Sequence, residues 1–159
     1  MELKQIVEPL IKWYEQEGRK LPWREGKNPY HIWISEIMLQ QTKIEAVKKY
    51  YDRFIQELPT IQDLAKVEED KLLKLWEGLG YYNRARNLKK AAIQIEEKFN
   101  GKMPKTYQDL ITLAGIGEYT AGAISSIAFN QKVPAVDGNV LRVLSRVTKS
   151  KKDVLLPET

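Results

Sequence analysis

Hydrophobic residues recur at helical spacing through most of this 159-residue chain. Side chains three or four positions apart lie on one face of a helix, so each such stripe predicts an amphipathic helix. The stripes run at about residues 6–14, 30–40, 47–55, 72–76, 88–99 and 140–144. The first two predict helices that are half to fully buried. No window alternates as a strand does, so we predict an all-α fold, a bundle of short helices around one core.

A glycine-rich turn separates two further predicted helices. Thr106 and Asp109 form a capping-box-like start for the first, and Gly115 and Gly117 end it by permitting positive φ. The next helix begins near Tyr119. Because the first N–H groups of a helix lack partners and its dipole is positive there, the turn can bind an anion such as phosphate. An ordinary helix–turn–helix corner explains the same pattern, and both interpretations stay open.

Asp137 stands at the start of another predicted helix. Pro134 forbids helix in the residues before it, and Val140 and Leu141 resume helical spacing after it. We therefore predict that Asp137 is an N-cap whose carboxylate accepts backbone N–H bonds and stays ionised near the positive helix end. Simple capping accounts for such a residue as well as a chemical role does.

A second carboxylate, Glu36, interrupts the apolar segment HIWISEIMLQQ. Its neighbours make the helix apolar nearly all round, so the carboxylate is expected to be partly desolvated, which raises its pKa. A carboxylic acid that keeps its proton near neutral pH can donate it. The alternative is a glutamate at the solvent edge of the helix.

Composition narrows the class of protein only slightly. With 43% hydrophobic residues the chain can bury one core, and 26 basic against 21 acidic residues give a net charge of +5. This balance suits a polyanionic partner, although many small proteins that bind no nucleic acid share it. The N-terminus shows no apolar run long enough for a signal peptide or a membrane span, so we expect a cytoplasmic protein. The absence of cysteine excludes disulfides, zinc thiolate sites and iron–sulfur clusters in this sequence.

Four sequence blocks, preceded by LPWR, extend over roughly residues 21–146. They are WISEIMLQQT, WEGLGYYNRARNL, LAGIGEYTAGAI and VDGNVLRVLSR. In this order they resemble the helix-hairpin-helix DNA glycosylases, and within them the adenine DNA glycosylases of the MutY type. The resemblance implies a six-helix-barrel-type domain and a monomeric base-excision repair enzyme, working at the nucleoid in a prokaryote. Such an enzyme hydrolyses the N-glycosidic bond of adenine opposite 8-oxoguanine or guanine in double-stranded DNA.

The resemblance also implies roles for the two carboxylates. Glu36, protonated, would donate to a ring nitrogen of the departing adenine, and Asp137, ionised, would face the sugar carbon as positive charge develops there. Electrostatic stabilisation and covalent trapping by Asp137 both stay open. Tyr119 would assist near the sugar, and Asn139 would hydrogen-bond Asp137 or the base. Packing on the core and a polar helix start are the structural alternatives for these two residues.

Tyr119 bears on the type of reaction. In the related enzymes of the endonuclease III type a lysine stands two residues beyond the second glycine, and its amine forms a Schiff base before the strand is cut. This chain has Tyr119 there. We therefore predict base excision without efficient strand cleavage. Thymine glycosylases of the same superfamily can also carry tyrosine there, so the residue does not fix the substrate.

Further blocks match the family's contacts to the adenine and the DNA strands. The target base must be flipped out of the helix, and an inserted aromatic side chain offsets part of the lost stacking, so Tyr81 would be a wedge. Alternatively, residues 78–86 are a loop-to-helix junction with aromatics in the core and arginines in solvent. The residues implied in the adenine pocket, strand contacts and phosphate contacts are Trp23, Arg24, Gln40, Gln41, Thr42, Leu79, Tyr81, Arg84, Arg86, Lys89, Lys90, Gly115 and Gly117.

The resemblance divides the chain into three parts. Residues 1–20 form an N-terminal helix, residues 21–136 a helical domain with its helix hairpin at about 106–129, and residues 137–159 the catalytic-aspartate helix and a shortened continuation. Family members usually continue with more helices that complete a second subdomain with the N-terminal helix, a four-cysteine [4Fe–4S] motif and a domain that recognises 8-oxoguanine. We therefore expect the N-terminal part of such an enzyme, with an incomplete second helical subdomain and no cofactor.

Two other functions remain open from the sequence. One is a non-catalytic helix-hairpin-helix fragment that only binds DNA. The other is a glycosylase of the same fold that removes thymine or oxidised pyrimidines.

Overall fold

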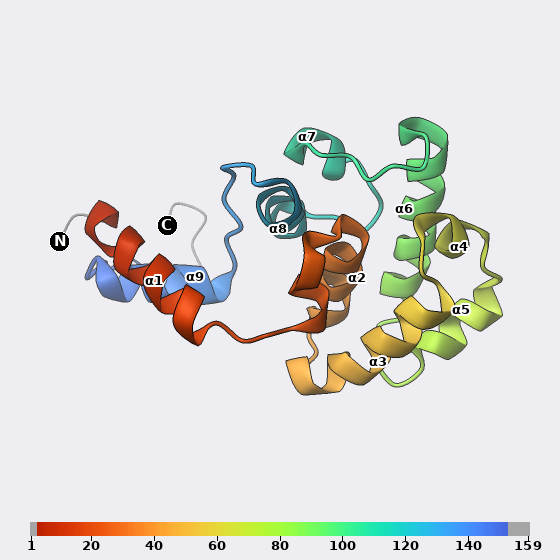
Figure 1. Cartoon of the computed structure of the whole chain (residues 1–159), viewed down its shortest axis with the longest axis horizontal. Helices are drawn as coiled ribbons and strands as arrows, with labels where there is room; N and C mark the ends of the chain where they lie inside the picture. The colour runs from red at the N-terminus through yellow and green to blue at the C-terminus, as the bar shows by residue number, and fades with distance from the viewer. Residues whose placement is uncertain (1–2, 153–159) are drawn as a thin grey trace. The chain divides into compact units, whose positions relative to one another are not determined.

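The computed structural model describes residues 3–152, and every regular element in that range is helical (Figure 1). The elements are η1 (Leu3–Ile6), α1 (Val7–Glu17), η2 (Pro22–Lys27), α2 (Pro29–Leu39), α3 (Ile44–Glu57), α4 (Ile61–Lys66), α5 (Glu69–Trp76), α6 (Asn83–Phe99), α7 (Tyr107–Leu110), α8 (Glu118–Phe129) and α9 (Gly138–Val147). The predicted all-α fold is confirmed.

The described residues divide into two compact units. Pro22–Ala135 form the larger one, and the residues up to Leu21 and from Val136 on form the smaller one. In the larger unit α2 packs against α3, α8 and η2, while α4 packs along α6 (Figure 1). Because α2 is apolar around most of its circumference, neighbours can cover it on several sides, and most of its residues are buried.

Local signals set the helix ends in the larger unit. The Asn28 side chain accepts a hydrogen bond from the Tyr30 N–H at 2.9 Å at the start of α2, where Pro29 occupies the first turn. Thr60 and Asp63 form a complete capping box at α4. The Thr106 hydroxyl accepts from the Asp109 N–H at 3.1 Å, so the predicted start of α7 is confirmed.

The smaller unit contains η1, α1 and α9. The expectation that the first helix is half to fully buried is wrong, because no residue of α1 is buried and Trp13 keeps 55% of its surface exposed. The physical reason is geometric. The described part of this unit consists of three short helices, which offer too little surface to enclose the apolar stripe of α1.

Candidate active site

Glu36 is a buried acid in the larger unit. It lies in α2 with 4% of its surface exposed, surrounded by helix neighbours that are themselves in the core. The alternative of a glutamate at the solvent edge is therefore excluded. Arg24 Nη2 lies 3.7 Å from Glu36 Oε1. A guanidinium therefore stands beside this buried acid.

The segment that carries Arg24 is anchored by Trp23. The Trp23 ring is fully buried and meets Tyr51 edge-on, with ring centroids 5.3 Å apart. A side chain with no exposed surface contacts no substrate in this conformation. In this conformation Trp23 supports η2. Its neighbour Arg24, whose side chain is about one third exposed, faces Glu36.

The glycine-rich turn joins α7 to α8 beside α6. Gly115 adopts φ +73°, and a Cβ there would lie 2.8 Å from Asn87 Cβ, so both conformation and space require glycine. The Ala114 N–H donates to Gln94 Oε1 at 2.8 Å, which fixes the turn to α6. Gly117 differs from expectation, since it is an extended N-cap with φ −90°. Its backbone continues directly into α8, so the turn needs only one left-handed residue.

Tyr119 lies in the first turn of α8. Its side chain is 38% exposed. It stands two residues after Gly117, so an accessible aromatic side chain lies at the N-terminus of α8. The predicted alternative of a tyrosine packed into the core does not fit this exposure.

Asp137 and Asn139 form a hydrogen-bonded pair in the smaller unit. Asp137 Oδ1 accepts from the Val140 N–H at 2.9 Å, which confirms the predicted N-cap, and Oδ2 accepts from Asn139 Nδ2 at 3.0 Å. Asn139 Oδ1 in turn accepts from Arg142 Nη2 at 3.1 Å. This bond orients the Asn139 amide with its NH₂ group toward the carboxylate. The predicted catalytic residues thus divide between the units, with Glu36 and Tyr119 in the larger one.

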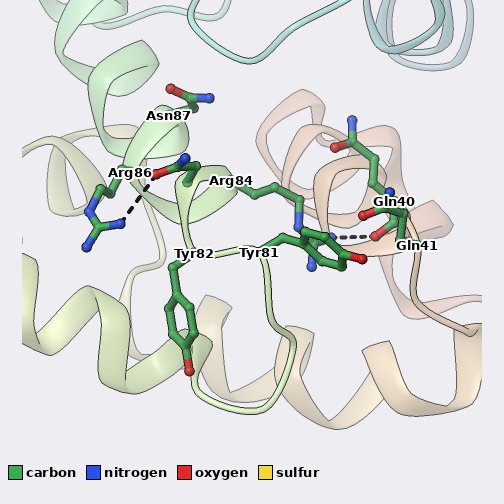
Figure 2. Close-up of a pocket in the computed structure, with 8 residues that line it drawn as sticks. Gln40, Gln41, Tyr81, Tyr82, Arg84, Arg86 and Asn87 are labelled. Carbon is green, nitrogen blue, oxygen red and sulfur yellow. Dashed lines mark hydrogen bonds between the residues drawn. The ribbon is translucent and has the colours of Figure 1, made fainter.

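Two loops of the larger unit meet at a pocket of about 790 Å³ (Figure 2). Gln40 and Gln41, after α2, line one side, and the segment from Tyr81 into α6 lines the other. Tyr81 is 66% exposed and points toward the two glutamines, whereas Tyr82 points away from them (Figure 2). The structure therefore brings together five of the residues expected to contact DNA, namely Gln40, Gln41, Tyr81, Arg84 and Arg86.

The expected DNA contacts differ in exposure. Leu79 keeps only 7% of its surface exposed, and Thr42 is half-buried with its hydroxyl 3.4 Å from the Gln40 carbonyl. Arg86 is exposed and pairs with Glu69 at 2.7 Å. Lys90 is exposed as well, and Lys89 is half-buried. Arg86 and Lys90 thus present positive charge on the surface of α6.

Arg84 is half-buried and lines the same pocket. Its guanidinium is turned inward, 5.3 Å from the centroid of the Trp76 ring and 5.8 Å from that of Tyr81. Desolvation lowers the pKa of this guanidinium from its usual value, although arginine remains charged. The spacing of the sequence gave no sign of this position, because the guanidinium also bonds backbone carbonyls at the distant end of α2.

No residues in this chain fit the iron–sulfur cluster that the resemblance implies for full-length relatives. A [4Fe–4S] cluster is held by cysteine thiolates, and the sequence contains no cysteine. Within residues 3–152, no three His, Asp or Glu side chains gather as metal ligands would. Every helix in the same range is too short or too polar to cross a membrane.

The helical fold, the glycine-rich hairpin and the buried glutamate define a helix-hairpin-helix protein. Residues 34–156 match the family described as HhH-GPD superfamily base excision DNA repair protein. The chain belongs to this family.

Three curated relatives are each named adenine DNA glycosylase. The protein from Buchnera aphidicola is 51% identical over 142 residues, covering 89% of this chain and 40% of its own length. Those from Rattus norvegicus and Homo sapiens are each 48% identical over 147 residues, covering 87% of this chain. The chain spans 28% of the rat protein and 27% of the human one, so it corresponds to less than half of each relative.

Solved structures of DNA glycosylases share the fold. A thermostable thymine-DNA glycosylase superposes with a TM-score of 0.83 at 32% identity, over 89% of this chain and 66% of that one. A non-covalent endonuclease III–DNA complex gives 0.78 at 28% identity, over 96% of this chain and 72% of that one. The helix-hairpin-helix glycosylase fold predicted from the sequence is confirmed.

Proposed function

We propose that this chain is the catalytic part of a monofunctional DNA glycosylase that removes adenine opposite 8-oxoguanine or guanine in double-stranded DNA. The observation that carries the proposal is the burial of Glu36 beside Arg24 in a chain 51% identical to an adenine DNA glycosylase. Burying an acid in an apolar helix costs folding free energy. Its presence there points to a function, and proton donation is such a function.

Glu36 is the proposed general acid. Its protonated form donates to a ring nitrogen of adenine while the bond to the sugar breaks, so the base leaves neutral. The transfer leaves a carboxylate in an apolar setting. The Arg24 guanidinium, 3.7 Å away, stabilises the negative charge formed at that moment.

Asp137 is the proposed counter-charge to the sugar. Hydrogen bonds from the Val140 N–H and the Asn139 amide hold its two carboxylate oxygens in place. The carboxylate stabilises positive charge on the sugar carbon, and a water molecule then adds to that carbon and releases its proton to solvent. Tyr119 supplies no amine for a Schiff base, so the strand stays intact.

DNA binding follows from the exposed parts of the larger unit. Tyr81 enters the helix where adenine leaves the stack, and Gln40 and Gln41 face the base left behind. The turn at Gly115 and Gly117 offers backbone N–H groups to a phosphate. Arg86, Lys89 and Lys90 add phosphate contacts that fix position without reading sequence.

Thymine removal is the competing function, because the thermostable thymine-DNA glycosylase has the same fold at 32% identity. Duplexes that carry A opposite 8-oxoguanine, A opposite guanine, T opposite guanine, or thymine glycol separate the candidates. We expect free adenine from the first two and strand cutting only after alkali. Thymine release in place of adenine would select the competing function, and binding without any product would select a DNA-binding fragment.

A further inference from the structure

The guanidinium of Arg84 connects two loops of the larger unit (Figure 2). Arg84 lies in the first turn of α6, and its terminal nitrogens donate hydrogen bonds to five backbone carbonyls. These belong to Ile37 (2.8 Å), Met38 (3.3 Å), Gln40 (2.5 Å), Leu79 (3.1 Å) and Gly80 (3.2 Å). One side chain thus holds the end of α2 and the loop before α6 together.

Arg84 adds donors to the carbonyls at the end of α2, where the Gln40 N–H also donates to the Ile37 carbonyl at 3.3 Å. The last carbonyls of a helix have no partner within it, and the negative end of the helix dipole favours a cation. Arg84 supplies both the N–H groups and the charge at Ile37 and Met38. A rigid planar fork reaches several acceptors at once, which a lysine ammonium cannot do in the same geometry.

Two of the five carbonyls precede residues in the left-handed conformation. Gln41 has φ +60° and Tyr81 has φ +49°, although neither is glycine. Arg84 bonds the Gln40 carbonyl, in the peptide group just before Gln41, and the Gly80 carbonyl, in the peptide group just before Tyr81. Such backbone conformations persist only where surrounding contacts impose them, and they gather at functional sites.

Both left-handed residues present their side chains to the same pocket. Gln41 is exposed, and Tyr81 covers the Arg84 guanidinium with its ring while leaving 66% of its surface open. The guanidinium also approaches Trp76, which is fully buried. The loop positions are therefore tied through Arg84 to the core.

We propose that Arg84 is a positioning residue. It holds the loops at Gln41 and Tyr81 in the conformation in which both side chains face the pocket and can bind DNA. The DNA-binding role of these loops rests on the proposed function, but their conformation can be measured without DNA. This positioning role replaces the expectation that Arg84 contacts a phosphate, since both terminal nitrogens of its guanidinium already donate to backbone carbonyls.

Amide hydrogen exchange in the whole chain tests the proposal. Arg84→Gln and Arg84→Lys are compared with Arg86→Gln, which removes an exposed arginine of the same helix and its pair with Glu69. We expect exchange to rise by about tenfold or more in both segments 40–43 and 79–82 for each Arg84 variant, and in neither for Arg86→Gln. A rise in only one segment, or in none, would overturn the proposal. If circular dichroism shows that Arg84→Gln does not fold, the exchange rates of Arg84→Lys, which keeps the charge, decide the test.

Salt dependence and single-turnover excision give the second readout. Loss of a phosphate contact lowers the slope of log K against log salt by about 1, as expected for Arg86→Gln. Arg84→Gln should leave that slope unchanged and slow excision instead, without rescue by Arg84→Lys. A lowered slope that lysine restores would make Arg84 a phosphate contact. If the unaltered chain excises nothing, the proposed function fails, and the exchange results still decide the role of Arg84.

Discussion

Asn139 donates a hydrogen bond from its side-chain amide to the Asp137 carboxylate at 3.0 Å, two residues away at the start of α9. The other carboxylate oxygen is held by the Val140 N–H. Both oxygens of a residue proposed to face a developing positive charge are thus fixed in direction. The Arg142 guanidinium holds the Asn139 carbonyl oxygen and so decides which end of the amide faces Asp137.

Replacement of Asn139 by alanine should slow excision without unfolding the chain. A hydrogen bond to a charged group contributes about 1.5–3 kcal/mol, so we expect a loss of about 10–100-fold in the single-turnover rate. Arg142→Gln should give a smaller loss, because it removes only the orientation of the amide. Arg146→Gln, an exposed arginine of the same helix, is the control. Equal rates for Asn139→Ala and the unaltered chain would remove Asn139 from the mechanism.

Replacement of Tyr119 by lysine should add strand cleavage to base excision. The new amine would stand at the exposed start of α8, where it can attack the sugar carbon and form a Schiff base. We expect strand cutting without alkali and a covalent protein–DNA complex after borohydride reduction. Glu118→Lys places the same amine one residue earlier and should give neither product. Equal strand cutting by Tyr119→Lys and Glu118→Lys would show that strand cleavage does not require the amine at position 119.

Replacement of Tyr81 by alanine should impair extrusion of the target base. Stacking between a base and an aromatic side chain is worth about 1–3 kcal/mol, so the signal of a fluorescent adenine analogue at the target position should fall with the excision rate by about tenfold or more. Tyr81→Phe keeps the ring and should retain most of the signal. Tyr82→Ala is the matched control, because that side chain points away from the glutamines (Figure 2). A loss for Tyr82→Ala alone would assign the wedge to the other tyrosine.

Gly122 tests the packing of α8 within the larger unit. A Cβ there would lie 2.0 Å from the Pro134 carbonyl oxygen, whereas one at Gly117 would meet nothing within 4 Å. Alanine in a helix interior normally gains about 1 kcal/mol over glycine. At Gly122 the clash should outweigh that gain and lower the free energy of unfolding by about 1–3 kcal/mol, measured by urea denaturation. Gly117→Ala should stay close to the unaltered chain, and a stable Gly122→Ala would contradict the packing described here.

Local features of the fold were predictable from the sequence because short-range chemistry decides them. The caps at Thr60, Thr106 and Asp137 each depend on a side chain and an N–H group three residues apart. The apolar neighbours of Glu36 also indicated its burial, although a place at the solvent edge stayed open until the structure excluded it.

Features that depend on distant residues could not be predicted. The left-handed backbone at Gln41 and Tyr81 runs against the preference of both residue types, and the Arg84 side chain bonds the carbonyl just before each of them. The complete burial of Trp23 reflects its contact with Tyr51, which periodicity does not reveal. The exposed stripe of α1 shows the same limit, because an apolar pattern predicts a face but not what covers it.

The proposed reaction depends most directly on the proton held by Glu36. The decisive measurement is the single-turnover rate of adenine release from a duplex with A opposite 8-oxoguanine, for the unaltered chain, Glu36→Gln and Glu97→Gln. Glutamine keeps the shape of the side chain without an acidic proton, so Glu36→Gln should lose about 100-fold or more of the rate, while the exposed Glu97 should be replaceable without effect. Adenine release by Glu36→Gln at the rate of the unaltered chain would contradict the assignment of Glu36 as the general acid.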